Sequence, residues 1–127
     1  MPIKLLSVLA VALGASIGAL ARWQLSEALN KTAALPLGTL AANWIGAYLI
    51  GIGLAFFSDS PKISEAWRLF LITGFLGGLT TFSAFSAEVV QFIQQGRWAL
   101  VGMEILLHVG GSIVLALLGV ATYFALR

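Results

Sequence analysis

Residues 74–88 decide how this sequence is interpreted, and they read GFLGGLTTFSAFSAE. The first 13 of them hold three glycines and four hydroxyl side chains, inside a stretch of 19 uncharged residues that is long enough to cross a bilayer. Glycine costs about 1 kcal/mol relative to alanine inside a helix, so the adjacent Gly77 and Gly78 predict a break there. A broken membrane helix needs protein or a cavity to satisfy the freed backbone groups. Its exposed carbonyl oxygens are suited to a hard cation such as Na⁺.

Charged residues divide the rest of the chain into stretches of similar length. Uncharged stretches of 17, 27, 19 and 22 residues follow Lys4, Lys31, Arg68 and Glu104. A spanning helix needs about 20 mostly apolar residues. The chain is therefore predicted to be all-α, a single integral membrane domain over residues 1–127. Its four transmembrane helices are expected at about 4–29, 37–57, 65–94 and 98–126, with the third helix broken at mid-membrane.

Composition agrees with a membrane protein and excludes several functional classes. Hydrophobic residues make up 60% of the chain and charged residues only 9%, whereas a soluble domain carries about 25% charged residues. The chain has no cysteine, which excludes a disulfide framework, a thiolate nucleophile and a cysteine metal site. A net charge of +2 without a basic run argues against nucleic acid as a partner. With no nucleophile–base set in the sequence, we do not expect an enzyme.

Basic residues give the chain almost no preferred orientation in the membrane. Four of them belong to the side that holds both termini, and two or three belong to the other side: Lys4, Lys62, Arg68 and Arg127 against Lys31, Arg97 and the more deeply placed Arg22. In such short loops this difference is a weak signal. The chain is expected to be able to insert both ways.

Glycines within the spans predict close helix packing, because small residues are what lets helices approach one another in lipid. Gly14 and Gly18 form such a face on the first span, and Gly46 lies on the second. The first segment also imitates a cleavable signal peptide, with Lys4, an apolar run and the residues 19–21. A packing face favours a retained helix instead. Four short helices leave little interior room, so we expect a homo-oligomer.

Polar residues inside the spans are candidates for an ion pathway, because such residues are costly in lipid. Thr39 and Asn43 share one face of the second helix, and His108 and Ser112 share one face of the fourth. Each also has a simpler interpretation, since a lone Asn or Ser often only joins two helices.

Other candidates lie on the third helix and near the span ends. Phe82 and Phe85 are three residues apart, so their rings follow one side of the helix, although phenylalanines in a span often face lipid. Glu88 and Arg22 lie near span ends, where they are expected to pair or to snorkel. His108 lacks a second metal ligand at a suitable spacing, so a metal site there is not expected.

Three motifs resemble those of the Fluc (CrcB) fluoride channels. Residues 74–88 look like the signature of that family, PLGTLAANWIG at 36–46 resembles its second-helix motif, and GASIGALAR at 14–22 resembles its first-helix motif. The length, the four spans and the undecided orientation fit as well. The resemblance therefore covers the whole chain.

The resemblance implies a passive, fluoride-selective channel of the bacterial inner membrane that exports cytoplasmic F⁻. Such channels are antiparallel, dual-topology homodimers with two pores. Main-chain oxygens of Gly77 and Thr80 from both subunits would hold a central Na⁺. The resemblance assigns six side chains to the pathway: Asn43 as a donor to fluoride, Phe82, Phe85 and Ser112 as lining residues, and Thr39 and His108 nearby. Fluoride is strongly hydrated, so N–H and O–H donors or the positive edge of an aromatic ring must replace its water.

Two positions depart from the family pattern. Ala84 stands where the family usually has Thr or Ser, and Ala116 follows Ser112 by one turn without a hydroxyl, which puts a continuous polar track in doubt.

Two other functions compete with a channel. A small multidrug-type, proton-coupled exporter would need a carboxylate deep in the first helix, but Glu27 is the carboxylate of that helix and it lies at the end. A purely structural helix-packing protein is the third hypothesis.

Overall fold

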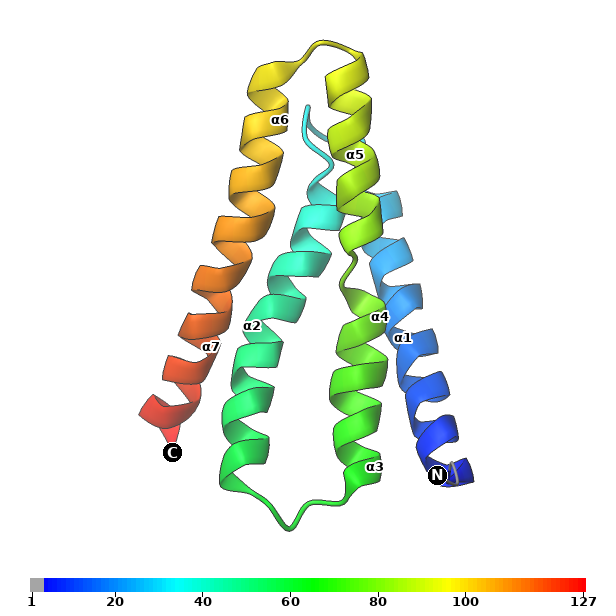
Figure 1. Ribbon diagram of the computed structural model, residues 1–127, viewed down its shortest axis with the longest axis vertical. Helices are drawn as coiled ribbons and strands as arrows, with labels where there is room; N and C mark the ends of the chain where they lie inside the picture. The colour runs from blue at the N-terminus through cyan, green and yellow to red at the C-terminus, as the bar shows by residue number, and fades with distance from the viewer. Residues whose placement is uncertain (1–3) are drawn as a thin grey trace.

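The computed structural model describes residues 4–127 and shows an all-helical protein over that range (Figure 1). Four segments are long and apolar enough to cross a membrane: Leu5–Leu29, Leu37–Asp59, Glu65–Gln94 and Trp98–Leu126. The first is helix α1 and the second is helix α2. All bounds lie within about two residues of those expected from the charge spacing. The predicted fold class and span positions are therefore confirmed at the level of a single chain.

The third and fourth spans are each built from several helical pieces. The third comprises α3 (Glu65–Arg68), η1 (Leu69–Leu76), α4 (Gly77–Leu79) and α5 (Phe82–Gln94). The fourth comprises α6 (Trp98–Ile105), η2 (Leu106–Gly111) and α7 (Ser112–Leu126). Both η elements are π-helical, a wider winding that is often found at functional sites.

The third span is interrupted halfway along, between α4 and α5. Thr80 (φ −86°, ψ 154°) and Thr81 (φ −150°, ψ 120°) are extended, and the span bends only slightly there (Figure 1). The predicted interruption is present, but the position expected from Gly77 and Gly78 was wrong. Gly77 is helical, with φ −63° and ψ −36°. Glycine propensity alone therefore does not place the break.

The glycines next to the break serve helix packing instead. A Cβ on Gly14 would overlap the carbonyl oxygen of Phe70, and one on Gly18 would overlap that of Phe75. From the other side, a Cβ on Gly78 would lie 2.5 Å from the carbonyl oxygen of Ala15. Backbone therefore meets backbone where α1 crosses η1 and α4, as the small-residue pattern predicted.

Helix α2 contacts all three other spans, including the C-terminal end of α1, where a Cβ on Gly38 would overlap the carbonyl oxygen of Leu25 (Figure 1). On one side α7 packs on α2, where Gly51 and Gly119 let the two backbones touch. On the other side lies the third span, and α1 covers its outer face. The hydroxyl-bearing break of the third span thus faces α2, and this positions the groove described next.

A polar groove beside the helix break

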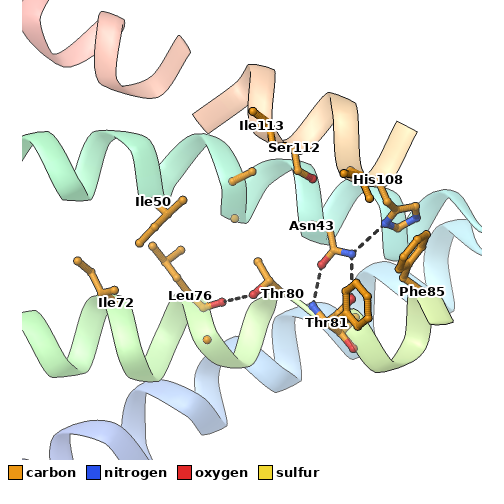
Figure 2. Close-up of a pocket in the computed structure, with 15 residues that line it drawn as sticks. Asn43, Ile50, Ile72, Leu76, Thr80, Thr81, Phe85, His108, Ser112 and Ile113 are labelled. Carbon is orange, nitrogen blue, oxygen red and sulfur yellow. Dashed lines mark hydrogen bonds between the residues drawn. The ribbon is translucent and has the colours of Figure 1, made fainter. Parts of the chain in front are cut away.

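A groove of about 490 Å³ opens between α2, the third span and the fourth span (Figure 2). Seven of the eight residues predicted for the pathway or the cation line it: Asn43, Gly77, Thr80, Phe82, Phe85, His108 and Ser112. No Lys, Arg, Asp or Glu belongs to its wall. The fold therefore brings residues from three different spans to one uncharged, partly polar surface.

Asn43 bridges α2 to the break in the third span. Its Oδ1 accepts a hydrogen bond from the backbone N–H of Thr81 (2.7 Å), and its Nδ2 donates to the carbonyl oxygen of the same residue (3.0 Å) (Figure 2). The side-chain amide thus satisfies both the backbone N–H and the backbone C=O of one extended residue. Broken backbone inside a membrane needs such a partner. The break lies at Thr80–Thr81 because Asn43 can satisfy Thr81.

The break also releases the two carbonyl groups that were predicted to hold Na⁺. In a continuous helix the N–H of Thr81 would bond to Gly77 and the N–H of Ala84 to Thr80. Here the first donates to Asn43 Oδ1 and the second to the hydroxyl of Thr81 (3.1 Å). A Cβ on Gly77 would meet no other span within 4 Å. Both carbonyl oxygens thus lack their usual helical N–H partners, and carbonyl oxygens are ligands that suit a hard cation.

Arg22 lies beside the break and was expected only to pair or to snorkel. Its Nε donates to the carbonyl oxygen of Gly78 (3.1 Å), on the last turn of α4. A cation at this position neutralises the partial negative charge of a helix C-terminus. Arg22 is therefore part of the packing between α1 and the third span.

Aromatic rings line one end of the groove. Phe82 and Phe85 meet edge to face, with ring centroids 5.4 Å apart, as their spacing predicted. Phe82 is 75% exposed, whereas Phe85 is buried against His108 with ring centroids 4.6 Å apart. In this geometry the positive edge of one ring points at the face of the other, and the remaining edge of each ring carries the same partial positive charge that attracts an anion.

Asn43 also contacts His108 across the groove. Its Nδ2 lies 3.0 Å from His108 Nδ1, so both N–H groups of the amide are directed at protein atoms. The predicted donation from Asn43 to fluoride would therefore compete with the contact to His108. Ser112, at the start of α7, projects toward the same part of the groove (Figure 2).

The two alanines that depart from the family pattern are not part of this surface. Neither Ala84 nor Ala116 lines the groove. The backbone of Ala116 packs on α2 where a Cβ on Gly51 would overlap its carbonyl oxygen. The interruption of the hydroxyl track therefore lies beside the groove and not across it.

Thr39 alone among the predicted residues lies outside the groove. It is 2% exposed, accepts a hydrogen bond from Asn30 Nδ2 (3.2 Å) and donates to Glu88 Oε2 (2.7 Å). Glu88 was expected to pair with a basic group or to snorkel. Within residues 4–127 no salt bridge joins it to Lys or Arg, and its Oε1 is buried without a hydrogen bond.

Sequence reasoning missed Glu104. This carboxylate is 1% exposed, inside the fourth span, and its Oε1 lies 3.5 Å from His108 Nε2. Ligand atoms of Glu88, Glu104 and His108 all lie within 4.8 Å of one another. The expectation that His108 lacks a second possible metal ligand at a suitable spacing was therefore wrong. The i, i+4 spacing of Glu104 and His108 could have predicted that these two side chains lie close together. Glu88 is distant in sequence, and only the folding of the chain brings it near them.

Comparison with known proteins gives one consistent result. The chain matches the family model described as "CrcB-like protein, Camphor Resistance (CrcB)" over residues 9–120. A protein of Albidiferax ferrireducens is 59% identical over 93% of this chain and 91% of its own length, and one of Pseudomonas putida is 57% identical over 93% and 94%. A third, from Chromohalobacter salexigens, is 53% identical over 96% and 93%. Each of these relatives is named a fluoride-specific ion channel FluC, so the expectation that the chain is not an enzyme is confirmed. With its four apolar spans and this match along nearly its whole length, the chain belongs to the CrcB family of multi-pass membrane channels.

Proposed function

We propose that the protein is a fluoride-selective channel through which cytoplasmic F⁻ leaves the cell passively. The observation that carries this proposal is the uncharged groove, which gathers an amide, hydroxyl groups and aromatic rings. Such groups can replace the hydration shell of F⁻ without binding it too tightly for exit. The names of the relatives support the same ion.

We further propose that two copies assemble antiparallel, with two pores per dimer. The nearly balanced basic residues favour insertion in both orientations. Phe82 is largely exposed in the single chain, and a Cβ on Gly77 would meet no other span within 4 Å. A second copy would cover this surface and close the open side of the groove.

A Na⁺ at the centre of that dimer is proposed as a structural ion. The main-chain oxygens of Gly77 and Thr80 would hold it, because the break has diverted their helical donors to other acceptors. When bound, the cation supplies a fixed positive charge beside an anion pathway. The chain itself contributes the extended Thr80–Thr81 backbone that interrupts the helical hydrogen bonds at these oxygens.

Within the groove we assign Asn43 and Ser112 as hydrogen-bond donors to fluoride, and Phe82 and Phe85 as rings that face the ion with their edges. His108 sets how tightly Asn43 is engaged, because it receives one of the two amide N–H groups. Thr39 lies behind the groove and acts through Glu88.

Purified protein reconstituted into proteoliposomes tests this function. Vesicles loaded with fluoride are expected to show passive, electrogenic efflux of F⁻ with far slower efflux of Cl⁻. Phe82→Ile should lower the F⁻ rate about tenfold, since an aliphatic chain has no quadrupole. Phe124→Ile, at an exposed ring on α7 away from the groove, is the matched control and should leave the rate unchanged. No efflux, or equal rates for F⁻ and Cl⁻, would overturn the proposal.

A further inference from the structure

Glu88 and Glu104, here called the acid pair, lie behind the ring of His108 and outside the lining of the groove. Among the residues that the structure describes, neither oxygen of Glu104 has a hydrogen-bond partner, although this residue is 1% exposed. Glu88 Oε1 is equally unpartnered, while its Oε2 accepts from Thr39. Three buried carboxylate oxygens without donors are costly unless something else binds there.

No cation compensates the acid pair within residues 4–127. The two ion pairs in this range are His108–Glu104 and Arg127–Asp59. Around the pair, α2 contributes Thr39 and the C-cap of α1 contributes Asn30, both neutral. The nearest charges by sequence on α1 and at the 94–98 turn are exposed: Glu27, Lys31 and Arg97, the last over the ring of Phe92. Among the His, Asp and Glu side chains of residues 4–127, His108 is thus the one other group beside the pair.

The hydrogen bonds of Asn43 determine the state of His108. Because Thr81 offers one N–H and one carbonyl oxygen, only one orientation of the Asn43 amide satisfies both. That orientation directs an N–H at His108 Nδ1, which must therefore be the acceptor. Neutral imidazole then carries its proton on Nε2. A protonated Nε2 has no lone pair for a metal ion, and it lies 3.5 Å from Glu104 Oε1 without a hydrogen bond to it.

A shared proton would partner the acid pair without a metal ion. Two carboxylates within 4.8 Å of each other repel when both are charged, and one hydrogen between them removes that repulsion and gives one of the three oxygens a donor. We propose that Glu88 and Glu104 share a single proton at neutral pH and that anion conduction requires this proton.

The consequence for conduction rests on the channel function proposed above. Loss of the shared proton adds a negative charge behind Phe85 and His108, which form the end of the groove. A second negative charge repels an anion that approaches these rings. Fluoride efflux should therefore fall as the pH on both sides of the membrane rises.

Infrared spectroscopy tests the shared proton without any transport assay. At neutral pH the wild-type protein should show the C=O band of a protonated carboxylic acid, and this band should disappear on alkaline titration. Glu104→Gln should lack it, whereas Glu27→Gln, the same substitution at an exposed position on α1, should keep it. Absence of the band from the wild type, or its survival in Glu104→Gln, would overturn the proposal.

Fluoride efflux tests the functional half, with equal pH inside and outside the vesicles. Between about pH 5 and about pH 9 the wild-type rate and that of Glu27→Gln should fall about tenfold, whereas Glu104→Gln should show a flat profile. A flat wild-type profile, or the same slope in Glu104→Gln, would overturn the requirement for the proton. If the wild type passes no fluoride at any pH, the channel function fails, and the infrared experiment still decides the shared proton.

Discussion

The two halves of the third span hold their neighbours by different means. Before the break, η1 and α4 press their backbone against α1, and glycines on both helices make the contact possible. After the break, α5 contacts α2 and the fourth span through side chains: Glu88 with Thr39, and Phe85 with His108. Close backbone packing holds the first half, and contacts between polar or aromatic side chains hold the second half.

The junction between these halves explains why both kinds of packing are needed. Close backbone contact in lipid requires small residues and tolerates no side chain between the helices. An interrupted backbone requires hydrogen-bond partners, which only a polar side chain such as Asn43 supplies here. The span therefore uses glycine packing before the break and polar side chains after it, and both meet at Gly78, whose carbonyl oxygen accepts from Arg22 Nε.

The largest effect is expected from filling the glycine-packed half. Gly18→Val places a side chain on the backbone of Phe75 and should destabilise the protein by about 3 kcal/mol, because neither backbone can move aside. Denaturant titration in detergent micelles measures this change. Gly102→Val is the control, since nothing lies within 4 Å of a Cβ at that position. Equal stability of the two variants would contradict the comparison.

A smaller effect is expected from removing the partner of the break. Asn43→Ala leaves the N–H and carbonyl oxygen of Thr81 without a hydrogen bond and should cost about 2 kcal/mol of unfolding free energy. Fluoride efflux should fall with it, because the groove loses a donor. Asn43→Asp keeps the acceptor for the Thr81 N–H and should lie between Ala and the wild type. If Asn43→Ala is as stable as the wild type, the break does not depend on this residue.

The helix cap after the break should matter less. Thr81→Val removes the hydroxyl that accepts from Ala84 N and should cost about 1 kcal/mol, while the backbone pairing with Asn43 remains. Thr81→Ser restores a hydroxyl and should recover most of the loss in the same titration. Failure of Ser to recover stability would mean that the methyl group, and not the cap, is what matters.

No measurable effect is expected at the exposed end of the molecule. Asp59→Asn removes the charged partner of Arg127, a contact of 2.7 Å between side chains that are 38% and 54% exposed. Exposed ion pairs contribute little because water and salt screen them. The thermal unfolding midpoint should stay that of the wild type. A clear decrease would show that polar contacts stabilise both ends of the molecule alike.

Sequence reasoning predicted the spans well and the break only roughly. Charge spacing placed the spans because a bilayer fixes how long an apolar helix must be. The position of the break depends on Asn43, which is 38 residues away from Thr81 in the chain. Local glycine propensity contains no information about such a partner, so the predicted position fell on Gly77 and Gly78.

The candidate site was also predicted only in part: its groove residues were named from the sequence, and Glu104 was not. Motif resemblance named seven residues that the fold brings to one groove, although their roles stay predictions. Glu104 escaped attention because a single carboxylate among apolar residues looks like the edge of a span. Its proximity to Glu88 arises from the packing of α5 against α6, which no spacing rule along the sequence describes.

The pairing of Asn43 with Thr81 also has a mechanical consequence. Two hydrogen bonds to the N–H and C=O of one residue resist rotation of the backbone on both sides of Thr81, so the interruption is held rigid. When bilayer thickness changes, the third span should tilt as one rod, since tilting is how a stiff helix adapts to a new thickness. The groove should then keep the same width in bilayers of different lipid composition.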